Sequence, residues 1–133
     1  MRRRSAAARV AAALALAALP AAGAADRPQG AGAQVARGAA LYEAHCAVCH
    51  GQNGRGGQGF PRPIWGPGHD LRKFATAQGL FEYLQLTMPF DDPQKLNDAE
   101  KLAVVAFLLA RNAAIREDGE ITPANAATIR VAP

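Results

Sequence analysis

The stretch Cys46-Ala47-Val48-Cys49-His50 contains both cysteines of the 133-residue chain. Two thiols three positions apart lie on one helical turn, so both can form thioether bonds to the vinyl groups of a single haem. The histidine that follows then lies under the iron and can bind it through an imidazole nitrogen. The spacing C-x-x-C-H therefore predicts one covalently attached haem c, with His50 as an iron ligand.

Two other kinds of site use cysteines at this spacing. A structural zinc site needs four ligands, often arranged as two pairs, and this chain would have to complete the set with His45 or His69. A redox-active C-x-x-C of the thioredoxin type belongs to a βαβ pattern, and no strand pattern precedes Cys46. The haem interpretation is therefore favoured over both.

The N-terminus has the parts of a secretory signal peptide. Four arginines among the first nine residues precede an apolar stretch, residues 10–19, which is too short to span a bilayer. A small-residue A-x-A cleavage site then ends at Ala24. We predict that residues 1–25 direct export to the periplasm and are removed, so that no membrane anchor remains.

The charge of the chain argues against a nucleic-acid partner. The net charge of +4 comes from the signal segment, and the remaining residues contain eleven basic and eleven acidic side chains. A nucleic-acid-binding surface needs an excess of basic residues. What remains is enough for one small domain with a limited core, in which a haem would supply much of the apolar interior.

Helical patterns cover most of the chain and no convincing strand occurs, so the sequence predicts a small all-α fold. Residues 26–34 are rich in proline, glycine and alanine and are interpreted as a flexible lead-in. Residues 113–133, interrupted by prolines, are expected to form an extended C-terminal tail. The expected helices run from residue 34 or 35 to 49, from 77 to about 87, and from 98 to 111.

Several residues define the ends and contacts of these helices. Thr76 is a predicted N-cap of the second helix, and Asn97 with Glu100 resembles a capping box at the start of the third. Asn112 is expected to end the third helix in the left-handed conformation. Gly38 costs the first helix stability, which suggests that another helix approaches closely there.

The loop of residues 51–68 is rich in glycine and proline. Residues 54–59 match G-x-G-x-x-G, but the dinucleotide fingerprint requires a preceding strand within a βαβ unit. Here a helix and a haem site precede the motif. We therefore interpret the glycines as residues that permit tight turns around the haem edge.

The second axial ligand of the iron is predicted to be Met88, the only methionine besides the initiator. It follows a predicted helix and precedes Pro89, which restricts its backbone to extended geometry. A thioether paired with histidine raises the reduction potential and suits electron transfer. His69 is the alternative ligand, and Met88 would then only fill the core.

Two functional classes remain after this assignment. With six iron ligands the protein transfers single electrons and is not itself an enzyme. With an open sixth position it would be a peroxidase-like haem enzyme or a gas sensor, which requires a distal acid or base. No histidine or arginine is obviously placed beside Met88, so electron transfer is favoured.

The sequence resembles class I c-type cytochromes over residues 35–112, which we take as the cytochrome c domain. The matching segments are residues 38–42, 46–51, 87–90 and 103–109. The resemblance implies that the first and last helices cross, with Gly38 and Tyr42 meeting the last helix near Phe107. It also implies a position for two further residues, which flank the haem: Ile64 and Trp65.

The same resemblance implies that a proline carbonyl orients the haem-ligating histidine. Pro61 and Pro63 both follow the glycine loop, and the sequence does not choose between them. Trp65 either packs in the core or donates its indole N–H to a haem propionate.

A narrower resemblance connects residues 65–68, residues 88–93 and the tail with cytochrome subunits of periplasmic sulfite and sulfane dehydrogenases. Such subunits accept electrons from a molybdenum-containing catalytic subunit. The resemblance therefore implies a redox protein as partner, either a molybdenum dehydrogenase subunit or a terminal oxidase.

Overall fold

The structure, a computed structural model, describes residue 30 and residues 32–132. The predicted signal peptide, residues 1–25, and most of the predicted lead-in lie outside the described residues. The helices are α1 (Ala33–His45), α2 (Ala47–His50), η1 (Asp70–Phe74), α3 (Ala77–Thr87), η2 (Pro93–Lys95) and α4 (Asp98–Arg111). Apart from one isolated bridge between Thr76 and Arg130, these residues contain no β-structure, which confirms the all-α prediction.

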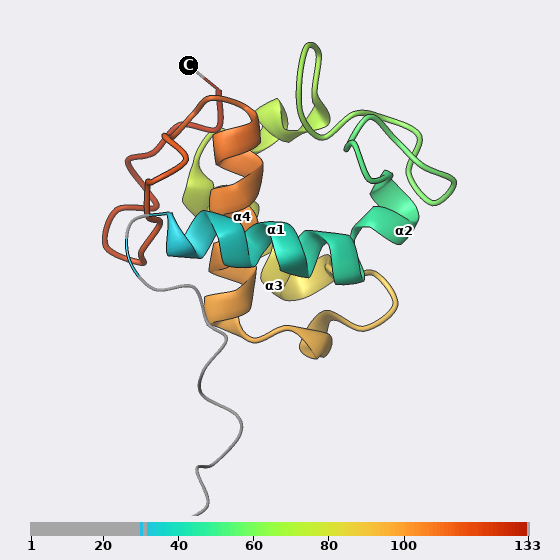
Figure 1. The fold of residues 1–133 in the computed structure, drawn as a ribbon, viewed down its shortest axis with the longest axis horizontal. Coiled ribbons are helices and arrows are strands. Elements are labelled where there is room, and N and C mark those ends of the chain that lie inside the picture. Colours follow the sequence, from blue (N-terminus) through green and yellow to red (C-terminus); the bar gives the residue numbers. More distant parts are fainter. Residues whose placement is uncertain (1–29, 31, 133) are drawn as a thin grey trace, which may run out of the picture.

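The centre of the fold is the crossing of α1 over α4 (Figure 1). Gly38 lies at the crossing, where a Cβ atom would stand 1.9 Å from the carbonyl oxygen of Ala103 and 2.8 Å from Cβ of Phe107. Only a residue without a side chain permits this approach. The predicted close contact at Gly38 is confirmed.

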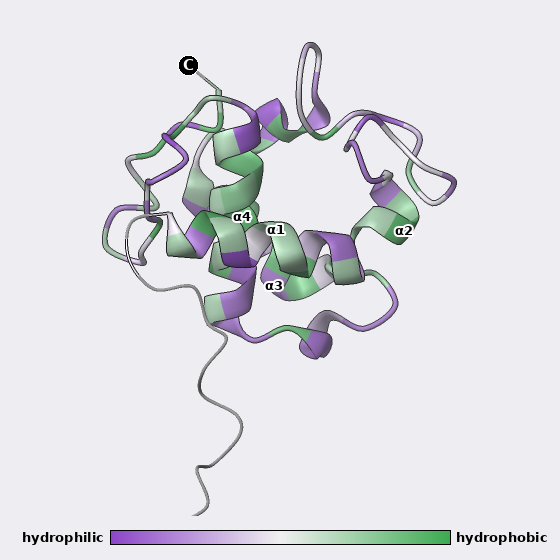
Figure 2. Ribbon diagram, viewed as in Figure 1, coloured by the Kyte–Doolittle hydropathy of each residue, from purple (hydrophilic) through white to green (hydrophobic). Residues whose placement is uncertain are grey.

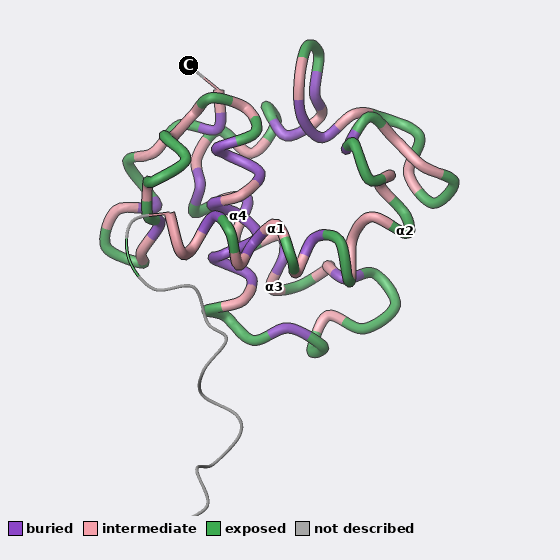
Figure 3. Tube along the Cα trace, viewed as in Figure 1, coloured by how far each residue is buried: buried purple, intermediate pink, exposed green. Residues whose placement is uncertain are grey.

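Helix α4 forms the core of the domain. Apolar residues occupy most of its surface (Figure 2), and it is buried along nearly its whole length (Figure 3). Its start is fixed by the predicted capping box: Asn97 Oδ1 accepts the Glu100 N–H at 3.0 Å, and the Glu100 carboxylate accepts the Asn97 N–H at 3.0 Å. These two bonds satisfy backbone donors that a helix N-terminus otherwise leaves free.

Helix α3 brings Met88 to the interior of the domain. It begins at the predicted N-cap, where Thr76 Oγ1 accepts the Gly79 N–H at 3.2 Å. Its buried residues Leu80 and Leu84 face the core. The helix ends at Thr87, and Met88 is extended, with φ −123° and ψ 142°, as expected before a proline.

The first helix is shorter than predicted. We expected it to continue to Cys49, whereas α1 ends at His45 and α2 begins at Ala47. Cys46 between them has φ −116°, which bends the chain. The apolar periodicity continues across this bend, so a pattern of side chains could not reveal it.

The expected left-handed conformation of Asn112 is wrong. Its φ is −97°, and the positive φ of 56° falls on Ala113. The Asn112 side chain is held by other bonds: Nδ2 donates to the carbonyls of Ile64 at 3.1 Å and Leu108 at 3.0 Å, and Oδ1 accepts the Gly66 N–H at 3.0 Å. The amide thus joins the end of α4 to the loop.

Residues 113–133 were expected to form an extended tail, but the described part of this segment, residues 113–132, folds back onto the domain. Ile121 and Val131 are 1% and 0% exposed. The Gln34 side chain donates to the Ile121 carbonyl at 2.7 Å and accepts the Ile121 N–H at 2.7 Å. The Val131 N–H donates to the Ala75 carbonyl at 3.0 Å. The apolar residues of this segment follow no helix or strand period, so the sequence pattern did not predict this packing.

Candidate haem-binding site

A cavity of about 770 Å³ opens between α2, η1, α3 and the loop that follows α3. This is within the range of cofactor sites, roughly 300–1,000 Å³. Five of the six predicted site residues line it: Cys46, Cys49, His50, Ile64 and Met88. Most of the other lining residues are apolar or aromatic, as the flat, apolar body of a porphyrin requires.

Cys46 is the N-cap of α2 and Cys49 lies within this helix, and both thiols are free. The carbonyl of Cys46 accepts the N–H groups of Cys49 at 3.1 Å and His50 at 3.0 Å, so one short turn holds all three residues. Burial, and to a lesser degree the neighbouring Cys49, raises the pKa of Cys46 to about 12. The turn therefore presents two reduced thiols and an imidazole to one cavity.

His50 has the properties of an unpaired ligand. Its Nδ1 is buried and has no hydrogen-bond partner among the described residues. Burial lowers the pKa of the imidazole, which favours the neutral form that binds metals. The ring packs beside Phe60 at a centroid distance of 5.1 Å. The sequence pattern did not single out Phe60, although an aromatic residue inside a Gly/Pro loop is a signal that could have found it.

The question of which proline orients His50 is narrowed by the backbone bonds. Nδ1 of His50 bonds neither carbonyl in the described part of the chain. The Pro63 carbonyl already accepts the Asp70 N–H at 2.8 Å. Among residues 30 and 32–132, no backbone N–H donates to the Pro61 carbonyl, so of the two carbonyls this one remains available to accept a bond from His50.

Met88 and its rival His69 differ in their position. Met88 lines the cavity, is partly buried, and its N–H donates to the Leu84 carbonyl at 3.1 Å. His69 is 6% exposed and does not line this cavity. Burial lowers the pKa of His69, and Arg72 lowers it further. Of the two candidate ligands, Met88 is the one that borders the space for a haem.

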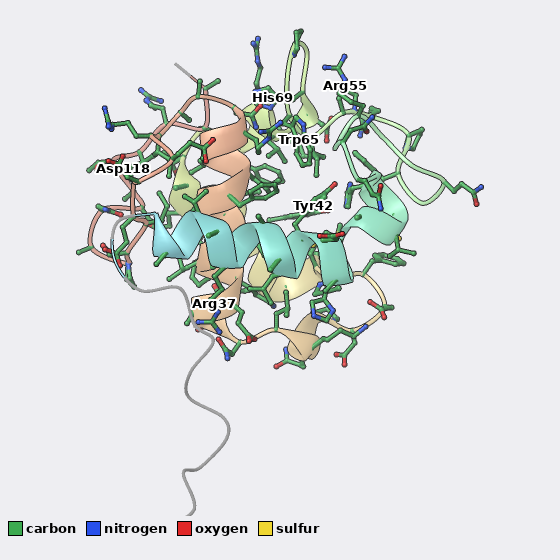
Figure 4. All side chains as sticks on the ribbon, viewed as in Figure 1. Arg37, Tyr42, Arg55, Trp65, His69 and Asp118 are labelled. Carbon is green, nitrogen blue, oxygen red and sulfur yellow. The ribbon has the colours of Figure 1, made fainter. Side chains whose placement is uncertain are left out.

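Trp65, the sixth predicted site residue, does not line the cavity. Its ring packs against Tyr42 at 5.0 Å and against Phe107 at 5.6 Å. Figure 4 shows Tyr42 on α1 and Trp65 in the loop beyond it. A Cβ on Gly54 would lie 2.3 Å from the indole, so glycine is required there. Trp65 thus packs in the core behind Tyr42, which lines the cavity. Core packing is one of the two roles that the sequence left open for Trp65.

Tyr42 connects this aromatic cluster to the ligand turn. Its hydroxyl donates to the carbonyl of Gly51, the residue after His50, at 2.7 Å, and burial raises the pKa of Tyr42, so the donor stays protonated. We expect Tyr42→Phe to lower the free energy of unfolding by about 1 kcal/mol. Tyr83→Phe, which removes a hydroxyl that forms no hydrogen bond with the described residues, is expected to cost less than about 0.5 kcal/mol. Chemical denaturation of both variants measures this, and equal effects would contradict the role of the Gly51 bond.

The described residues do not support the zinc alternative. Within them, no three His, Cys, Asp or Glu side chains gather as a metal site would require.

The described part of the chain contains no helix with the length and apolar character needed to cross a bilayer.

Comparison with known proteins agrees with this site. Residues 33–108 match the family described as cytochrome C oxidase, cbb3-type, subunit III. The chain belongs to this family of c-type cytochromes. It therefore carries a covalently bound haem c, for which Cys46 and Cys49 are in place.

Relatives of this cytochrome domain occur in sulfur metabolism. Thiosulfate dehydrogenase of Stutzerimonas stutzeri is 34% identical over 92 residues, covering 62% of this chain and 28% of the relative. Thiosulfate dehydrogenase of Allochromatium vinosum is 35% identical over 82 residues, covering 54% and 29%. The chain thus spans less than a third of the length of these curated relatives.

Among solved structures, the sulfane dehydrogenase SoxCD from Paracoccus pantotrophus is similar to this cytochrome domain. The TM-score is 0.62 and the identity 27%, over 72% of this chain and 52% of that chain. This similarity confirms the helical cytochrome fold and the resemblance to a sulfane dehydrogenase.

Proposed function

We propose that this protein is a periplasmic carrier of single electrons whose haem iron is bound by His50 and Met88. The observation that supports this proposal best is the shared cavity. It brings together the imidazole of the C-x-x-C-H turn and the thioether that follows α3, although 38 positions separate them in the sequence.

Haem c, when bound, supplies an iron that accepts and releases one electron. The residues of the chain determine how easily it does so. The neutral imidazole of His50 and the soft thioether of Met88 favour ferrous iron together and raise the reduction potential. Apolar side chains around them keep water away and lower the local dielectric. The aliphatic side chains that line the cavity from η1, α3 and α4 are Leu71, Leu80, Leu84, Val104 and Leu108.

Two fixed ligands also favour rapid transfer. When both remain bound in both oxidation states, little rearrangement accompanies each electron. The proposed role is therefore transfer to and from protein partners, with no bond made or broken in a substrate at this haem.

The relatives suggest the pathway in which the electrons move. Two are named thiosulfate dehydrogenases and a third is a sulfane dehydrogenase. We propose that the protein accepts electrons released during the oxidation of sulfur compounds. The donor would be a dehydrogenase subunit, with a molybdenum-containing subunit as the candidate, and the acceptor a terminal oxidase or another carrier.

The proposed location follows from the N-terminal sequence. Residues 1–25 have the basic, apolar and small-residue parts of an export signal. Cell fractionation and N-terminal sequencing of the purified protein test this. Recovery of the intact N-terminus from the cytoplasm would contradict the proposal.

The decisive test of the ligand set is Met88→Ala. Ferric wild-type protein should have the far-red charge-transfer band of methionine-to-iron ligation, and the variant should lose it. The variant should also have a lower reduction potential, because the thioether no longer favours ferrous iron. Optical spectra and redox titration measure both effects.

The controls separate the alternatives. Leu86→Ala, a change at a side chain that is 82% exposed two residues before Met88, should leave the band in place. If Met88→Ala retains the wild-type band and potential, Met88 is a core residue and His69 is the ligand to test. If wild-type ferrous protein binds carbon monoxide readily, the iron has an open position and the carrier proposal fails.

A further inference from the structure

Lys101 is a charged residue in the core of the domain. It lies on α4 and is 3% exposed. No carboxylate in the described part of the chain forms an ion pair with it. Its ammonium instead donates to two backbone carbonyls, that of Gln85 at 3.1 Å and that of Pro93 at 2.6 Å. Burial of a charge is costly without such partners, so the arrangement calls for a physical reason.

The carbonyl of Gln85 needs a donor from outside its helix. In an α-helix it would accept the N–H of the residue four positions later. That residue is Pro89, which has no N–H. The proline that stiffens the chain after Met88 therefore removes a helical hydrogen bond, and Lys101 replaces it from the neighbouring helix.

The two carbonyls bracket one segment of the chain. Gln85 precedes the segment 86–92 and Pro93 follows it, and Met88 lies between them. A single ammonium thus holds both ends of the segment against α4. Gln85 is tied to the start of α4 a second time, because its side chain donates to Asp98 at 3.0 Å.

We propose that Lys101 is a positioning residue for Met88. The inference rests on the proposed function, in which the Met88 thioether binds the haem iron. By closing the segment 86–92, the ammonium keeps the thioether on the iron and sets the rate at which the segment opens to admit another ligand. A buried charge that acted only through its field would shift the reduction potential and leave the opening rate unchanged.

The opening rate can be measured on the ferric holo-protein. Imidazole binds only after Met88 leaves the iron, so at high imidazole concentration the binding rate levels off at the rate of opening. Lys101→Leu removes both hydrogen bonds at similar size. We expect it to raise the limiting rate by about tenfold or more, the ratio that corresponds to one charge-assisted hydrogen bond.

The matched control is Lys73→Leu, which removes the same charge from a side chain that is half exposed and pairs with Asp70. It should stay within about twofold of wild type. Lys101→Gln retains an uncharged amide N–H donor group and should lie between wild type and Lys101→Leu; it serves as the variant if the leucine protein does not fold. A Lys101→Leu or Lys101→Gln protein with the wild-type limiting rate would overturn the proposal, even if its potential has shifted.

A measurement on unchanged protein completes the test. In ¹⁵N spectra of the lysine side chains, the ammonium protons of Lys101 should exchange with water at least about tenfold more slowly than those of Lys73. Equal exchange would mean that the two carbonyl bonds do not form. Absence of the far-red band in wild-type protein would instead show that Met88 does not bind the iron. That result would contradict the proposed function, and it is distinct from a failure of the Lys101 proposal.

Discussion

Gly38→Ala is expected to destabilise the holo-protein by at least about 3 kcal/mol, although helix propensity alone predicts the opposite sign. In an ordinary helix position, alanine is about 1 kcal/mol better than glycine. At this position the new Cβ would lie 1.9 Å from the carbonyl oxygen and 2.6 Å from the carbonyl carbon of Ala103. Backbone atoms cannot rotate away as a side chain can, so α1 and α4 must separate.

Chemical denaturation of the holo-protein measures the effect, and Ala40→Gly is the matched control. Ala40 is exposed on the same helix, so this change should cost only the difference in propensity, about 1 kcal/mol. A Gly38→Ala protein as stable as wild type would show that the two helices do not meet at this distance.

The replacement of both cysteines, Cys46→Ala with Cys49→Ala, is expected to abolish covalent haem attachment. Haem staining after denaturing electrophoresis should be absent, and acidified acetone should extract any haem that is present. Single replacements should leave at most one thioether and much less mature protein. Val48→Ala lies between the two thiols, at a residue that is 80% exposed, and should retain the covalent haem.

Loss of haem should also remove much of the folded state. The cavity of about 770 Å³ is a large empty volume for a domain of this size, and side chains that line an empty space lose their packing partners. We expect circular dichroism to show reduced helix content in the double variant. Retained staining in that variant would contradict thioether formation at these two positions.

The sequence predicted those features that local chemistry determines. The bounds of α3 and α4, the N-cap at Thr76 and the capping box at Asn97 follow from hydrogen bonds between residues close in the chain. The position of His50 beside the cavity follows from a spacing of five residues.

The features that the sequence did not predict depend on residues far apart in the chain. The left-handed conformation expected of Asn112 does not form, and its side-chain amide is instead hydrogen-bonded to the backbone of Ile64 and Gly66. The role of Lys101 arises only when the Gln85 carbonyl, which lacks a donor within its own helix, is placed beside it. Neither set of hydrogen bonds produces a periodic pattern or a motif in the sequence, so the sequence alone does not predict them.

The double hydrogen bond between Gln34 and Ile121 determines how this cytochrome can be joined to other domains. It places the start of α1 beside the folded-back segment 113–132 (Figure 1). No residue of that segment lines the haem cavity. A second domain joined directly before α1 or after residue 132 would therefore attach away from the cavity and leave the route for electrons open. The same bonds make residues 113–132 part of the folded domain. A fusion protein truncated after Arg111 would therefore lose the segment that packs against the start of α1.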